Sequence, residues 1–159
     1  MEINVLINEG FEGRLDENWL QSIVEHVLTA EDTDSDVELS LVIASQERVQ
    51  QLNRSYRRKD EPTDVLAFAM LSSEETSGAD SPFIVPPDGV LHLGEVIISY
   101  PQAVIQAKEH RHPIEREVTI LTIHGVLHLL GYEHDKPELE RQMRAREAEI
   151  LSSIERDAT

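Results

Sequence analysis

Residues 124–134, with the sequence HGVLHLLGYEH, place three histidines at a spacing typical of a metal site. On an α-helix, residues four apart lie one turn above each other on the same face, so His124 and His128 can direct two imidazoles to a common point. Gly131 is suited to end this helix in a left-handed conformation, which lets the chain turn back and bring His134 to the same point. The stretch therefore predicts three ligands for one metal ion.

Three neutral imidazoles suit Zn²⁺ and leave the fourth tetrahedral position for water, as in a catalytic site. One Zn²⁺ ion is thus the predicted cofactor. The same spacing, H-x-x-x-H-x-x-G-x-x-H, occurs in metzincin peptidases, which carry Glu directly after the first His as the general base. Here that residue is Gly125, so peptide hydrolysis by that mechanism is disfavoured. The alternative, ordinary histidines on an apolar helix, is less consistent with the spacing of the triplet.

Length and composition indicate one domain spanning residues 1–159. The absence of cysteine excludes disulfides and Cys-based metal sites, and no apolar run is long enough to span a membrane. With no basic segment at the N-terminus, we expect a cytoplasmic protein without a membrane partner. The net charge of −17 argues against broad attraction to nucleic acid, so any RNA contact must be local.

Hydrophobic periodicity predicts an α+β fold in which a mixed sheet of about four strands is covered by about five helices. Alternating patterns indicate strands at residues 2–7, 37–43, 64–70 and 90–99, the last with a bulge or bend at Gly94. Helical spacing follows the N-cap candidates Asp16, Ser45 and Ser99 and the prolines Pro113 and Pro137. Because the helix that starts at Pro113 is apolar nearly all round, it should lie centrally. Residues 72–89 are expected to form a long surface loop.

The chain resembles bacterial YbeY-type endoribonucleases, a ribosomal RNA maturation family. The matching pieces are Leu52-Asn53, Tyr56-Arg57, Lys59-Asp60, residues 62–66, Phe68, Leu93-Gly94-Glu95, the histidine stretch, Met143, Glu147 and Ile150. This resemblance implies a zincin-like domain with zinc on His124, His128 and His134. It also implies single-strand-directed RNA cleavage in 16S ribosomal RNA maturation and ribosome quality control. The implied partners are ribosomal RNA, the small ribosomal subunit with its proteins, and a ribosome-assembly GTPase.

Four cations, Arg54, Arg57, Arg58 and Lys59, form a local exception to the acidic composition. An Arg can clamp phosphoryl oxygens with two hydrogen bonds, and the match to the family's Tyr-Arg pair selects Arg57 as the catalytic candidate. The residues alone do not rank the three arginines, and capping of a helix C-terminus also explains cations there. Lys59 is a substrate-binding candidate that could equally be a solvated lysine.

The sequence identifies no general base, since Gly125 cannot be one. Glu95, Glu133 and Asp135 are neighbouring candidates, and the last two could instead orient the histidine ligands. The remaining histidines, His26, His92, His110 and His112, have ordinary explanations as strand, helix-surface or helix-end residues and are left outside the metal site.

Two rivals to the endoribonuclease hypothesis stay open. One is a non-catalytic assembly factor that binds the small ribosomal subunit and uses zinc chiefly for structure. The other is a metal-dependent hydrolase of another substrate, such as a peptide or a nucleotide. An RNA cleavage assay on purified protein, before and after chelation, separates the endoribonuclease hypothesis from both rivals.

Overall fold

The computed structural model describes residues 2–8, 10, 15–33, 36–57, 65–69, 91–132 and 136–157, with the side chains of 55–57, 69 and 91 outside that description. The strands are β1 (Glu2–Ile7), β2 (Val37–Ala44), β3 (Val65–Ala69) and β4 (Leu91–Ser99). The helices are α1 (Glu17–Ala30), α2 (Gln46–Arg57), α4 (Tyr100–Glu109), α5 (Ile114–Leu129) and α6 (Pro137–Asp157). This arrangement confirms the predicted α+β class.

The four strands form one mixed sheet in the order β1-β2-β4-β3. β1, β2 and β4 are parallel, whereas β3 pairs antiparallel with β4 at the edge. Along β4, His92 pairs with Glu38 and Gly94 pairs with Leu39, so Leu93 is an extra residue at a bulge. Gly94 has φ of 135°, a conformation that glycine adopts without steric cost, and the predicted irregularity is confirmed.

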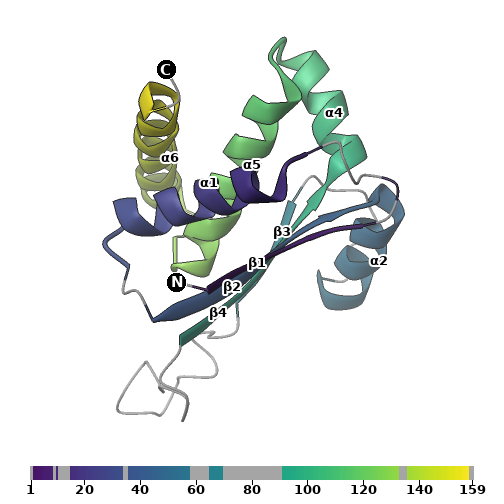
Figure 1. The fold of residues 1–159 in the computed structure, drawn as a ribbon, viewed down its shortest axis with the longest axis horizontal. Helices are drawn as coiled ribbons and strands as arrows, with labels where there is room; N and C mark the ends of the chain where they lie inside the picture. Colours follow the sequence, from purple (N-terminus) through teal and green to yellow (C-terminus); the bar gives the residue numbers. More distant parts are fainter. Residues whose placement is uncertain are drawn as a thin grey trace.

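Helices cover both faces of the sheet (Figure 1). α1, α5 and α6 lie over one face, where they share the larger apolar core with alternate residues of β2 and β4. α2 lies on the opposite face, where Val49 packs in a smaller cluster with Ala44, Leu66 and Ile97. The alternation of side chains along each strand therefore supplies two separate cores.

α5 is the central helix, as its apolar sequence predicts. It packs against β3, β4, α1, α4 and α6, and residues on several of its faces are buried. Gly125 lies where α5 crosses β4, and a Cβ added there would stand 2.5 Å from Val96 Cγ1. The glycine therefore sets how closely the helix approaches the sheet.

Among the described residues, no helix has the length and apolarity needed to span a membrane.

Candidate active site

His124 and His128 lie together on α5, as their spacing of four predicts. Their ring centroids are 4.6 Å apart and the ring planes meet at 78°. Both residues are half-buried, so the rings are neither packed inside the core nor freely solvated. Two imidazoles so placed form one half of a possible metal site, and their role as ligands stays a prediction.

The helix ends just beyond these rings through a glycine turn. Gly131 has φ of 106°, and its N–H donates to the carbonyl of His128 at 3.1 Å. The N–H of Tyr132 donates to the carbonyl of Leu127 at 3.0 Å, which completes a Schellman motif. The predicted left-handed helix end is therefore present. His134 lies outside the described residues, so its convergence on the other two rings stays a prediction.

A glutamate on α6 orients the first of the two rings. Glu147 Oε1 lies 2.7 Å from Nδ1 of His124, and the two side chains are 21% and 30% exposed. In the tautomer with the proton on Nδ1, this ring donates to the carboxylate, and Nε2 is the nitrogen that could coordinate a metal. Carboxylate–histidine contacts of this kind fix the orientation of metal ligands in many proteins.

Glu147 was quoted above as a matching residue, but sequence reasoning gave it no role. It lies four residues after Met143 and three before Ile150, both of which are buried. Residues at this spacing share one face of a helix, so Glu147 is a carboxylate on the inward face of α6. That interruption of an apolar stripe was the signal that could have found it.

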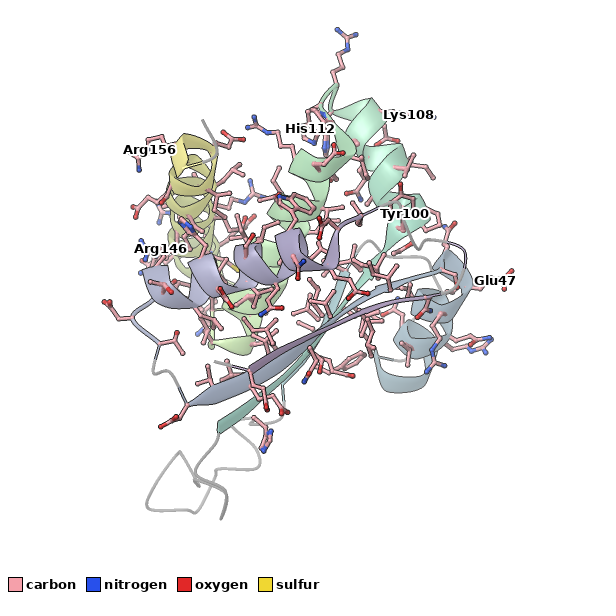
Figure 2. The ribbon with its side chains drawn as sticks, in the orientation of Figure 1. Glu47, Tyr100, Lys108, His112, Arg146 and Arg156 are labelled. Carbon is pink, nitrogen blue, oxygen red and sulfur yellow. The ribbon has the colours of Figure 1, made fainter. Side chains whose placement is uncertain are left out.

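An ion-pair network holds the turn that follows α5. Arg146 Nε lies 3.2 Å from Glu31 Oε1, and its guanidinium also donates to the carbonyl of Ala30, which ties α6 to the end of α1 (Figure 2). Burial, followed by the hydrogen bond and charge of Glu31, raises the pKa of Tyr132. Hydrogen bonding to Glu31 raises the pKa of Arg146. Tyr132, which follows the end of α5, therefore stays protonated beside the ion pair of Arg146 with Glu31.

The predicted RNA-binding cations lie at the end of α2 and in the residues that follow it. Arg57 is the last residue of α2, and its side chain lies outside the description, as do Lys59 and all of residues 58–64. These residues lead from α2 to β3, one of the two strands on which α5 packs. The placement of Arg57 and Lys59 beside the histidines therefore stays a prediction.

The structure argues against Glu95 as a general base. Its neighbour Val96 faces α5 at Gly125, and successive side chains of a strand point to opposite faces. Glu95 is therefore directed toward the face that α2 occupies, away from His124. The other two candidates, Glu133 and Asp135, lie outside the described residues.

A second group of potential metal ligands lies at the other end of α5. One ligand atom from each of His110, His112 and Glu117 lies within 4.8 Å of the other two. Sequence reasoning explained both histidines by their position at a helix end and did not connect them with Glu117. The described part of the chain thus contains a group that could hold a metal ion, although this group is not the predicted one.

Comparison with known proteins identifies relatives over nearly the whole chain. A family model described as endoribonuclease YbeY matches residues 7–155. A Dehalococcoides mccartyi protein with that name is 45% identical over 155 residues, covering 97% of this chain and 97% of the relative. A Roseiflexus protein with the same name is 39% identical over 153 residues, covering 96% and 92%, and one from Oceanobacillus iheyensis is 43% identical over 135 residues, covering 85% of each.

The fold also has a counterpart among solved structures. The solution structure of a Thermotoga maritima protein matches with a TM-score of 0.57 and 26% identity, covering 98% of this chain and 93% of that one. The match extends over all the elements described above and supports the predicted fold. Together with the sequence matches, it confirms the family and the enzyme class that the matching residues suggested. The chain therefore belongs to the endoribonuclease YbeY family.

Proposed function

We propose that this protein is a zinc-dependent endoribonuclease that cuts single-stranded RNA during maturation of 16S ribosomal RNA and in ribosome quality control. The observation that carries the proposal is the pair of adjacent rings on α5, with Nδ1 of His124 held 2.7 Å from Glu147. The relatives named endoribonuclease YbeY supply the reaction class. The RNA source and the metal are the parts that we add.

The described residues fit a zinc ion. His124, whose Nδ1 contacts Glu147, and His128 would hold it from α5. Imidazole nitrogens are preferred zinc ligands, and His134 would be the third. When bound, the ion supplies Lewis acidity, which stabilises negative charge on a phosphoryl oxygen and acidifies water.

The protein's own groups would orient the substrate and the ligands. Glu147 acts as a positioning residue, because its carboxylate fixes the ring of His124 through Nδ1. Arg57 would bind two oxygens of the scissile phosphate through its planar guanidinium, and Lys59 would add a point charge toward the same strand. These two roles rest on the match of the Tyr-Arg and Lys-Asp pairs to the family.

The packing of Gly125 weighs against the peptidase alternative. A metzincin needs a glutamate side chain at this position, directly after the first histidine. Here the first side-chain atom alone would stand 2.5 Å from Val96 Cγ1. A longer side chain therefore has no room at this position without movement of α5 or β4, and position 125 faces the sheet.

We further propose that residues 1–159 act as one cytoplasmic domain whose access to RNA depends on protein partners. The net charge of −17 opposes unguided association with RNA. The proposed partners are ribosomal RNA, the small ribosomal subunit with its proteins, and a ribosome-assembly GTPase. Cleavage of subunit precursors should therefore be faster than cleavage of the same RNA without proteins.

The test combines elemental analysis of purified protein with cleavage of a single-stranded RNA before and after chelation. We expect zinc-dependent cleavage, and loss of cleavage in Arg57→Glu. Arg54→Glu, an exposed substitution on the same helix, is the matched control for the charge change and should retain cleavage. A zinc-loaded protein that never cuts RNA, but melts at a lower temperature once chelated, would instead support the assembly-factor alternative.

A further inference from the structure

We propose a second divalent metal site, separate from the predicted zinc site, formed by His110, His112 and Glu117. The cluster lies at the turn where α4 meets α5 (Figure 2, where His112 is labelled). Glu117 Oε2 lies 2.5 Å from Nε2 of His112 and 3.3 Å from Nδ1 of His110. Two imidazoles from one turn thus converge on a single oxygen of the next helix. Zn²⁺ is the ion that this group fits best.

The local backbone brings the two histidines together. α4 ends in a Schellman motif, in which the N–H of Arg111 donates to the carbonyl of Lys108 and that of His112 to the carbonyl of Ala107. Arg111 has φ of 57°, a left-handed conformation that costs a non-glycine residue about 1–2 kcal/mol. This turn places the rings of His110 and His112 with centroids 5.5 Å apart.

The buried carboxylate supplies the electrostatic reason for a cation. The side chain of Glu117 is 3% exposed, and a carboxylate removed from water needs a compensating positive charge as well as hydrogen bonds. Within the described ranges no lysine or arginine pairs with it, and its partners are the two imidazoles. A divalent ion held between the three groups would place positive charge directly beside this carboxylate.

The donor set and the spacing fit zinc. Two imidazole nitrogens with one carboxylate oxygen form a known zinc set, whereas Mg²⁺ and Ca²⁺ prefer oxygen ligands. Tetrahedral ligands at ordinary zinc distances stand roughly 3.3 Å apart. His110 and Glu117 already meet this spacing, and the contact of His112 with Glu117 would open by about 1 Å to admit the ion. His110 is 57% exposed, which leaves a path for entry and a position for water.

The second site would be distinct from the first, although both use α5. Glu117 precedes His124 by seven residues, which corresponds to two helical turns and about 10 Å along the axis. An ion at the cluster would join the end of α4 to the start of α5. Because it binds only the folded chain at this site, it should stabilise the helix that carries His124 and His128.

The experiment isolates the cluster by disabling the predicted zinc site. In a His124→Ala/His128→Ala background, Zn²⁺ binding is measured by calorimetry and Co²⁺ binding by visible absorption. We expect one-ion binding that Mg²⁺ does not compete away, and at least a tenfold loss of affinity on adding His110→Ala, since even an outer partner of a ligand contributes 10–100-fold. His26→Ala, a histidine hydrogen-bonded to Ser153, is the matched control and should leave binding unchanged.

Two further measurements keep the result decisive. Shifts of the His110 and His112 ring signals in NMR spectra during the Zn²⁺ titration would place the ion at the cluster. Because Glu117 is buried, Glu117→Gln is read by the same titration after its folding has been checked. The proposal is overturned if the background variant takes up no Zn²⁺ or if His110→Ala leaves uptake unchanged. Either failure leaves the proposed endoribonuclease untouched, because the predicted zinc site is disabled in this assay.

Discussion

A pair of histidines with one glutamate lies at each end of α5, but the two groups are built differently. At the C-terminal end, Glu147 comes from another helix and contacts one ring through Nδ1. At the N-terminal end, Glu117 is almost fully buried, and one of its oxygens contacts a ring nitrogen of each histidine. In the first arrangement the carboxylate orients a ligand, whereas in the second the carboxylate is itself a ligand candidate.

The difference shows that a histidine pair near a carboxylate does not by itself identify a site. The ring nitrogen that the carboxylate contacts decides which nitrogen of that ring can coordinate a metal. Burial then decides whether the carboxylate needs a cation for its own charge. Two histidines and one glutamate therefore give a proposed reactive centre at one end of the helix and a proposed metal clamp at the other.

Removing a ring from the C-terminal pair should have the largest effect. His124→Ala deletes a proposed zinc ligand, so RNA cleavage should fall at least a hundredfold, to the level of chelated protein, because even an outer partner contributes 10–100-fold. Cleavage of a labelled single-stranded RNA at saturating zinc measures the loss. Calorimetry should still detect zinc binding at the N-terminal cluster. Full cleavage by this variant would show that the C-terminal pair is not the reactive centre.

Glu147→Gln tests whether the carboxylate orients the ring. The amide keeps the size of the side chain but removes its charge, so zinc affinity should fall roughly 10–100-fold. Competition with a chromophoric chelator measures the affinity, and excess zinc should restore most of the cleavage. Glu149→Gln is the matched control, because Glu149 lies on the same helix but pairs with Arg146 at the surface. Equal losses in both variants would assign the effect to general charge rather than to ring orientation.

Gly125→Ala tests a feature that distinguishes the C-terminal half of α5, where the helix meets β4 at a glycine. The new methyl group would stand 2.5 Å from Val96 Cγ1, so the free energy of unfolding should fall by about 1–3 kcal/mol. Urea denaturation measures the change. Val96→Ala in the same chain should restore part of the loss if the contact is the cause.

Gly131→Ala is the control for this prediction. It should also destabilise the chain, because φ of 106° is strained for alanine, although within the described part of the chain only adjacent residues come within 4 Å of the added Cβ. Val96→Ala should not rescue it. If Val96→Ala rescues both variants equally, the loss at position 125 does not come from the contact with Val96.

Much of the fold could be predicted because its signals are local. Asp16 accepts from the N–H groups of Asn18 and Trp19 at the start of α1, and Ser45 and Ser99 cap the next two described helices with their hydroxyls. Alternation located the strands, and Gly131 located the end of α5. The proximity of the two rings of the C-terminal pair followed from helical periodicity alone.

The contacts that sequence reasoning missed depend on tertiary packing or on an unusual backbone. Glu147 reaches His124 only because α6 packs on α5, and no spacing between residues 124 and 147 encodes that approach. His110 and His112 converge only because Arg111 is left-handed, a conformation for which glycine or asparagine would have been the signal. The face toward which Glu95 points could not be predicted, because the orientation of β4 relative to α5 was unknown from the sequence.

A third pair, His92 with Glu38 at 2.8 Å, extends the comparison to a half-buried contact between two strands and predicts the smallest effect. Glu2 lies opposite Glu38 in the sheet, and the hydrogen bond to Glu38, followed by its charge, raises the pKa of Glu2. The folded chain thus holds this proton to higher pH than the unfolded chain, so the small stabilisation present below the ordinary value is lost as the pH rises through the folded pKa. In an NMR titration, Glu38→Gln should lower the Glu2 pKa, whereas His92→Ala should raise it, because the ring's charge lowers that pKa. Shifts of the same sign in both variants would mean that Glu38 and His92 do not act on Glu2 as opposite charges.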